Sequence, residues 1–431
     1  MTLIRRLFIL AWFLIVLTTG CAPAPQSNSN STVSTQPSPS PSASPSPAIT
    51  IADTASVQIT LPLLDALLTD DKFVARVKKD LKLNDQQIEE LKNVSGSAVA
   101  RLRESNAEDL DGDEPAAPAR AEDQLRSVLG EEKARDLAKL ANDYWSKGDA
   151  SEASNDNIQM LKGPNAVPTD TRVVVNIPAF RMDLFQDGSL VKSYKVGIGY
   201  PQFPLPLGLR RAQQIIFNPT WTPPDSPWVA KMKNVAPGET VEAGDKDNPL
   251  GPIKIPIGLP SLIHGGKSPA KIGKFASHGC VGLTNAQIKD FATMLGQISN
   301  TPGVPTKMAT YLEDETKTQT VKLTQTVPVE LRYETIVIED GKLHIYRDVY
   351  AQDTNTEENL RRVLEANGMK LEDLSEQQRT QILAALNSKP KKEVVIDLGT
   401  VAQKGYPAPV DLNTGTTDKT DKQRGSKRIR T

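Results

Sequence analysis

SLIHGGKSPAKIGKFASHGCVGLTN, residues 261–285, contains two of the protein's three histidines and one of its two cysteines. A cysteine thiol reacts as a nucleophile in its thiolate form, so it needs a base nearby. His264 precedes Cys280 by 16 residues, which is far enough for a loop to fold back and bring the imidazole to the sulfur. We therefore predict a cysteine nucleophile with a histidine base in this stretch.

The residues around Cys280 predict a shaped turn followed by a helix. Gly279 can adopt a backbone conformation that other residues avoid. Such a turn would expose the sulfur and direct the N–H groups of Gly279 and Cys280 at one point, as an oxyanion hole requires. Thr284–Gln287 reads as a capping box that opens the helix IKDFATML, whose dipole would favour a thiolate.

His264-Gly265 and Ser277-His278-Gly279-Cys280 resemble the catalytic motif of the YkuD-type L,D-transpeptidases of bacterial cell-wall assembly. Asn218–Pro224, NPTWTPP, and Asp247–Gly251, DNPLG, are similar to further segments of that domain, so the resemblance covers residues 168–312. One position departs from the pattern, because many members carry arginine where this chain has Gly282. A guanidinium that would bind a substrate carboxylate or form a structural ion pair is therefore missing.

The resemblance implies a mainly β catalytic domain, a β-sandwich or barrel with a short helix, within an α+β multidomain chain. It also implies a peptidoglycan L,D-transpeptidase that needs no cofactor and no metal. Cys280 would attack the carbonyl of the L-centre of the diamino acid at position three of a stem peptide. D-Ala would leave, a thioester would form, and an amine of a second stem would attack it. His264 would be the base, and a further set would position substrate or the oxyanion: Gly265, Ser277, His278 and Gly279.

Several alternatives stay open on the sequence alone. Water could attack the acyl-enzyme, which would make the protein an L,D-carboxypeptidase or an amidase, or a wall-linked protein could be the acceptor. A non-catalytic lipoprotein that binds peptidoglycan is the alternative outside enzymes. His278 could shape the turn, bind substrate or favour the thiolate. Trp221 could line a cleft or belong to a core, whereas His344 lies in an alternating strand and is predicted to be structural.

The N-terminal residues predict export and lipidation. Residues 1–20 carry two arginines and then an apolar run, as a signal peptide does. Leu17–Cys21 resembles a bacterial lipobox, so Cys21 is expected to be acylated and to anchor the protein to a membrane; plain signal cleavage or an uncleaved anchor is the alternative. Residues 21–50 form a Ser/Pro-rich linker. Ala22 follows Cys21 directly, which resembles the sequence of bacterial lipoproteins that are sorted to the outer membrane. We therefore expect the protein in the cell envelope, facing the periplasm.

The remaining segments alternate between helical and strand patterns. Residues 51–160 carry apolar side chains at helical spacing and predict a helical domain. Residues 313–352 predict a β extension, with Asp340-Gly341 as a two-residue hairpin turn. Residues 356–388 return to helix, and 389–431 predict a disordered tail.

Composition excludes other classes of function. The formal net charge is −1, which gives no reason to expect nucleic-acid binding. Two cysteines form no disulfide framework, and three dispersed histidines form no metal-ligand cluster. The acidic run Glu108–Glu114 has its glycine in the wrong place for a calcium-binding EF-hand loop.

Overall fold

The computed structural model describes residues 59–412 except for 69, 105–116, 148–158, 224–228, 230–231, 233, 237, 259–260 and 400–404. The predicted signal peptide, linker and lipidation site at Cys21 lie outside the described residues. No helix in the described part of the chain is both long enough and apolar enough to cross a membrane.

The region predicted to be helical contains five helices, Leu61–Leu68 (α1), Asp71–Leu81 (α2), Asp85–Glu104 (α3), Ala117–Leu129 (α4) and Glu131–Lys147 (α5). Their apolar faces share one core, in which Leu64, Phe73 and Leu137 are fully buried. The ring of Phe73 packs against that of Tyr144 at a centroid distance of 5.1 Å. Helix formation here follows the three- and four-residue spacing of the apolar side chains.

The catalytic-domain region is built on one mixed eight-stranded sheet with the order β3-β2-β1-β10-β5-β6-β7-β9. Its first strands are Arg172–Asn176 (β1), Arg181–Gln186 (β2), Ser189–Lys195 (β3) and Gly208–Phe217 (β5). The others are Ile253–Pro256 (β6), Leu262–His264 (β7), Val281–Gly282 (β9) and Gln319–Arg332 (β10). Most neighbours are antiparallel, while the β1–β10 and β7–β9 pairs are parallel. Ile198–Gly199 (β4) and Phe275–Ser277 (β8) form a separate parallel pair.

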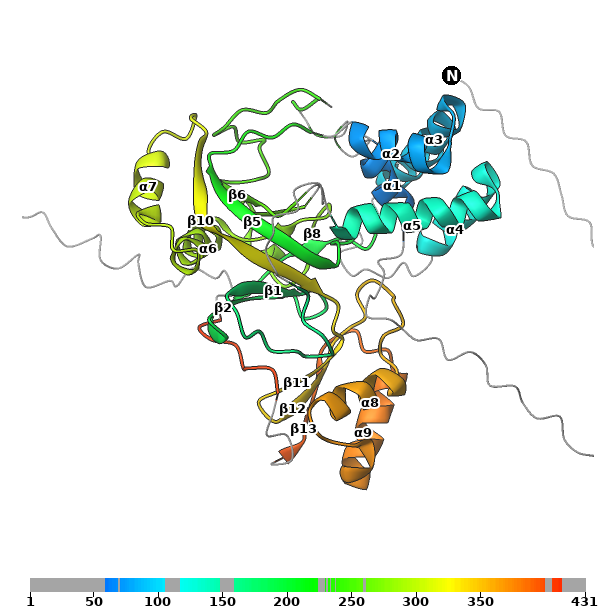
Figure 1. Ribbon diagram of the computed structural model, residues 1–431, viewed down its shortest axis with the longest axis vertical. Coiled ribbons are helices and arrows are strands. Elements are labelled where there is room, and N and C mark those ends of the chain that lie inside the picture. The colour runs from blue at the N-terminus through cyan, green and yellow to red at the C-terminus, as the bar shows by residue number, and fades with distance from the viewer. Residues whose placement is uncertain are drawn as a thin grey trace, which may run out of the picture. The chain divides into compact units, whose positions relative to one another are not determined.

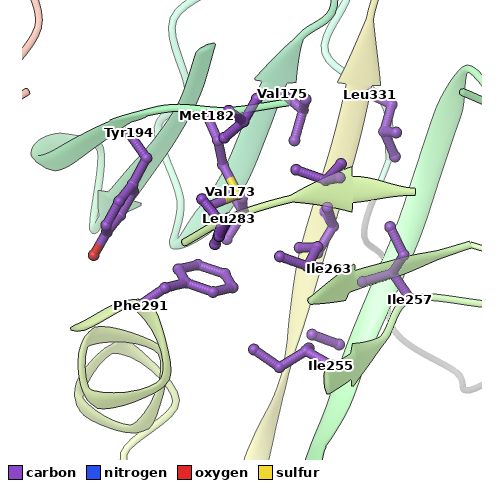
Figure 2. Close-up of a cluster of buried hydrophobic side chains, with 14 of the residues drawn as sticks. Val173, Val175, Met182, Tyr194, Ile255, Ile257, Ile263, Leu283, Phe291 and Leu331 are labelled. Atoms are coloured by element: carbon purple, nitrogen blue, oxygen red, sulfur yellow. The ribbon is translucent and has the colours of Figure 1, made fainter. Parts of the chain in front are cut away.

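One face of the large sheet is covered by helix Asn285–Ile298 (α6), which lies against β6 and β10, with Val304–Tyr311 (α7) beside it (Figure 1). Figure 2 shows Phe291 projecting from α6 toward the sheet, where Tyr194, Met182 and Leu283 converge. The Tyr194 and Phe291 rings meet edge to face at 5.8 Å. Burial of these apolar groups holds α6, and the residues that precede it, at a set position on the sheet.

The C-terminal residues form a smaller α+β module. Ile336–Glu339 (β11), Lys342–Ile345 (β12) and Val394–Asp397 (β13) make a three-stranded antiparallel sheet, and Glu357–Ala366 (α8) and Glu376–Asn387 (α9) share its core. The predicted hairpin turn is present, with φ of 47° at Asp340 and 74° at Gly341.

The structure confirms an α+β chain with a mainly β catalytic domain, but two segments differ from the sequence-based description. β10 falls in the region assigned to a β extension, yet it lies inside the large sheet between β1 and β5. β13 falls in the segment assigned to a disordered tail, yet it completes the three-stranded sheet. In both cases the strand is specified by partners that are distant in sequence, which local patterns do not reveal.

Candidate functional site

The site is built on the end of the sheet formed by β6, β7 and β9. Successive side chains of a strand point to opposite faces. One set faces the hydrophobic core and is buried: Ile253, Ile255, Ile263 and Val281. The alternate positions, occupied by Lys254, His264 and Gly282, therefore share the opposite face.

Strand register brings the predicted base and nucleophile together on that face. His264 is paired with Lys254 on one side and with Gly282 on the other, and Ile263 is paired with Val281. Cys280 directly precedes Val281, so it lies on the face of Gly282 and is a diagonal neighbour of His264. The topology thus places His264 and the turn that carries Cys280 on adjacent strands, although 16 residues separate them in the chain.

The turn before the thiol has the conformation expected of a glycine. Gly279 has φ of 96°, and its carbonyl accepts a hydrogen bond of 3.1 Å from the Ser261 hydroxyl. The Cys280 N–H donates to the Ser277 hydroxyl oxygen at 3.0 Å, and that hydroxyl donates back to the Cys280 carbonyl. Ser277 therefore closes the turn. The Cys280 N–H is already engaged in this structure, contrary to the expectation that it is a free oxyanion donor.

Burial sets the protonation states of both groups. His264 is 3% exposed, and burial together with the charge of Lys267 lowers its pKa to about 3; backbone hydrogen bonds at Gly265 and Leu250 act in the opposite direction. Its Nδ1 is buried and has no hydrogen-bond partner among the residues that the structure describes. Desolvation raises the pKa of the Cys280 thiol, against smaller lowering effects from the Leu262 backbone and from Lys267. The free site therefore holds a neutral imidazole beside a neutral thiol at pH 7, and an imidazole in that state can accept a proton.

The residues that follow His264 and Gly282 pack against the start of helix α6. A side chain at Gly265 would meet Ile288 of α6 at 2.8 Å, so only glycine fits between β7 and the helix. The Gly266 N–H donates to the Asn285 carboxamide oxygen at 2.8 Å, which ties the segment after His264 to the start of α6. The predicted capping box is confirmed, because the Thr284 hydroxyl and the Gln287 side chain each accept from the other's backbone N–H.

The other three candidates take distinct positions. The His278 ring is partly exposed and packs against Phe203, with centroids 4.6 Å apart, and against Tyr200 at 5.5 Å. Trp221 pairs its backbone with Val241 and packs on a small separate apolar cluster. His344 lies on β12, remote in the fold from the other two histidines, with its Nδ1 2.7 Å from Glu393. Among the described residues no group of acidic, histidine and cysteine side chains could hold a metal ion.

Residues 170–322 match a family model described as the L,D-transpeptidase catalytic domain, YkuD. These residues belong to the YkuD family. A curated relative, the probable L,D-transpeptidase ErfK/SrfK of Escherichia coli K12, is 31% identical over 125 residues, which are 27% of this chain and 38% of that protein. The match therefore spans well under half of the relative's length.

Solved structures similar to the YkuD domain are also L,D-transpeptidases. The catalytic domain from Enterococcus faecium is 17% identical, with a TM-score of 0.26, over 39% of this chain and all of that one. An L,D-transpeptidase from Mycobacterium tuberculosis is 13% identical, with a TM-score of 0.22, over 38% of this chain and 57% of that one.

Two lysines of the YkuD domain were not among the predicted site residues. Lys254 is paired with His264 across the β6–β7 ladder, and its ammonium donates to the Thr220 carbonyl at 3.1 Å. Lys267 follows β7, and its charge acts on both His264 and Cys280. The alternation Ile-Lys-Ile-Pro in β6 could have identified Lys254 as a residue on the face opposite the core. Nothing local in the sequence indicates where the Lys267 side chain lies.

Proposed function

We propose that this protein is a peptidoglycan L,D-transpeptidase that works through a thioester on Cys280. The observation that carries the proposal is the register of β7 and β9, which makes Cys280 and His264 neighbours on one face of a YkuD domain. Within the described part of the chain, the buried Nδ1 of His264 has no hydrogen-bond partner, which suits it to accept a proton from a thiol on the adjacent strand.

The reaction follows from the neutral state of the pair. As the Cys280 sulfur attacks the carbonyl carbon of the third residue of a donor stem, its proton passes to His264. The C–N bond to D-Ala then breaks, and the imidazolium returns the proton to the departing amine, which leaves a thioester. An amine of a second stem attacks the thioester and gives its proton to His264, and the thiol is reformed as the new amide bond is made.

Burial, together with the lysines around the imidazole, favours the second half of this proton path, in which the imidazolium gives its proton to the departing amine. Positive charges at Lys267 and Lys254 both lower the pKa of His264, so the imidazolium formed during attack readily gives its proton away. A base of low pKa is neutral before attack and a strong acid afterwards. The same groups support hydrolysis when water replaces the acceptor amine, so L,D-carboxypeptidase activity is an alternative outcome of the test.

The test uses the purified full-length chain with disaccharide-tetrapeptide muropeptides, analysed by mass spectrometry. Transpeptidation predicts cross-linked dimers, free D-Ala and a Cys280-linked acyl adduct, whereas carboxypeptidase activity predicts tripeptides and D-Ala only. Cys280→Ala should remove both product and adduct, because no thiol remains, and Cys280→Ser should react far more slowly. Ser268→Ala is a matched control on an exposed loop residue. Turnover by Cys280→Ala above a few per cent of wild type would contradict the assignment.

We also propose that Cys21 carries lipid and anchors the enzyme in the cell envelope, where the residues 21–50 linker lets the domain reach peptidoglycan. A lipobox-like sequence followed by a Ser/Pro-rich linker supports this. Labelling cells with a fatty-acid analogue should mark the wild-type protein but not Cys21→Ser. An unlabelled wild-type chain would refute the anchor without touching the proposed reaction.

A further inference from the structure

Gly282 follows the proposed nucleophile in the motif, and another residue occupies the space that a side chain at position 282 would take. A Cβ atom at Gly282 would come within 2.8 Å of Lys267 Cγ, 3.0 Å of Cε and 3.3 Å of Cδ. The Lys267 stem therefore lies directly on Gly282, over the position opposite His264 in the β7–β9 pair. Contacts below 3.0 Å are closer than real Cβ atoms tolerate, so an alanine at residue 282 and Lys267 in its present place exclude each other.

The backbone at Gly282 does not itself require a glycine. Its φ is not positive, so an L-amino acid would fit without strain. Hydrogen bonds of 2.8 Å in both directions join Gly282 to Gly197, and the Lys267 N–H donates to the Leu283 carbonyl at 3.1 Å. Because the backbone is held on both sides, an alanine at residue 282 would displace the side chain of Lys267 rather than the backbone.

The charge of Lys267 acts on the thiol. Lys267 is half-buried, and burial lowers the pKa of its ammonium, while Cys280 raises that pKa and Lys271 lowers it further. Reciprocally, Lys267 is the charged side chain that lowers the pKa of Cys280. In the described part of the chain Lys267 forms no ion pair with a carboxylate, so no structural partner neutralises its charge.

We infer that Lys267 is a positioning residue whose ammonium stabilises negative charge on the Cys280 sulfur, and that residue 282 is glycine so that the lysine can lie there. The inference rests on the proposed function only in taking Cys280 as the nucleophile. A cation beside a sulfur in a partly desolvated site favours the thiolate, so Lys267 offsets part of the cost of burial.

Other titratable groups surround the thiol, and the experiment must separate them from Lys267. They come from the strands and loops packed about it: His264, Lys254, Lys271, His278 and Tyr200. Lys271 is the matched control, because it is a neighbouring cation whose ammonium bonds to the Tyr200 hydroxyl at 3.4 Å and whose charge acts on Lys267.

The experiment measures iodoacetamide alkylation of Cys280 in the full-length protein against pH, followed by peptide mass spectrometry so that Cys21 does not contribute. Lys267→Met should move the inflection up by about one pH unit, which means about tenfold slower alkylation at pH 7. Lys267→Arg keeps the charge and should restore most of the rate, and Lys271→Met should shift the inflection much less. Thermal melts establish that each variant is folded.

Gly282→Ala supplies the independent arm, because it displaces Lys267 without changing any charge. It should slow alkylation as Lys267→Met does, yet have little further effect when added to Lys267→Met, since the clashing side chain is then gone. The inference is overturned if Lys267→Met leaves the pH of the inflection unchanged. It is also overturned if Gly282→Ala slows alkylation equally in the wild-type protein and in the Lys267→Met protein. Alkylation does not depend on turnover, so the two tests are independent. The muropeptide assay can contradict the proposed transpeptidase reaction while alkylation supports the role of Lys267, and alkylation can contradict that role while the muropeptide assay supports the reaction.

Discussion

His264 combines a buried ring, an Nδ1 that no described residue hydrogen-bonds and two lysines nearby. Its pKa of about 3 lies well below the ordinary 6.5, so the ring is neutral throughout the physiological range. We predict that acylation of the wild-type enzyme shows no acidic limb near pH 6.5. His264→Ala should slow acylation by about 10²–10⁴-fold, with partial rescue at high pH where thiolate forms without a base.

Stopped-flow acylation with a β-lactam of the carbapenem class, from pH 4 to 9, measures both effects. His278→Ala is the matched control, because it removes a second imidazole from the same region and should keep the shape of the profile. The role of His264 as base would be wrong if His264→Ala and wild type had profiles of the same shape.

The same low pKa makes a prediction about stability. Below pH 6.5 the unfolded chain binds a proton at His264 that the folded chain does not bind until about pH 3. The free energy of unfolding should therefore fall as the pH drops from 6.5 toward 3, by as much as about 5 kcal/mol. His264→Gln should flatten this part of the curve in urea unfolding at several pH values. An equally steep acid dependence in that variant would show that carboxylates, rather than His264, cause it.

At the scale of elements, the start of α6 holds the motif in place. Thr284 caps the helix, Gln287 donates through its side-chain amide to the Lys195 carbonyl of β3 at 2.9 Å, and Asn285 accepts from Gly266. Thr284→Ala removes the cap and should lower the free energy of unfolding by about 1 kcal/mol. Thr310→Ala is the control, since Thr310 is an exposed residue in the last turn of α7, where alanine favours helix.

Urea unfolding of the two variants compares the cap with the control. A cap role also predicts that Thr284→Ser retains most of the stability, because serine keeps the hydroxyl acceptor. Equal losses for Thr284→Ala and Thr310→Ala would show that the cap contributes little here.

At the scale of the whole molecule, the C-terminal module is joined to the YkuD domain next to the motif. Tyr350 lies beyond residues 170–322, yet its hydroxyl donates to the Gly199 carbonyl at 3.0 Å and accepts from the Leu205 N–H at 3.1 Å. Gly199 in turn lies against Gly279, since a Cβ there would be 3.2 Å from the Gly279 nitrogen. The module thus supports the turn that precedes Cys280.

Tyr350→Phe keeps the ring but leaves a buried N–H without its partner, so we predict a loss of about 1–3 kcal/mol in the free energy of unfolding. Tyr311→Phe, at a partly exposed position in α7, is the control. Differential scanning calorimetry measures both variants. A Tyr350→Phe protein as stable as wild type would show that the hydrogen bonds of the Tyr350 hydroxyl contribute nothing to the free energy of unfolding.

Signals confined to a few residues were readable from the sequence. The capping box at Thr284 and the Asp340-Gly341 hairpin are both present, because each depends on residues no more than three positions apart. The glycine turn at Gly279 is present as well, whereas the roles of Cys280 and His264 stay predictions that rest on their chemistry and spacing. Helix α4 falls within residues 51–160, which the apolar spacing predicts to be helical, and its Leu125 and Val128 join the helical core.

Tertiary structure decided the features that depend on distant partners. β10 belongs to the large sheet because it pairs with β1 and β5, strands more than 100 residues earlier, and β13 forms because β12 offers an edge. The Cys280 N–H is engaged by Ser277, and Lys267 occupies the space over Gly282, only because loops and strands bring these groups together. Sequence thus determined which groups are candidates for the chemistry, whereas strand register decided which of them share a face, because a shift of one residue would turn His264 or Cys280 to the opposite face.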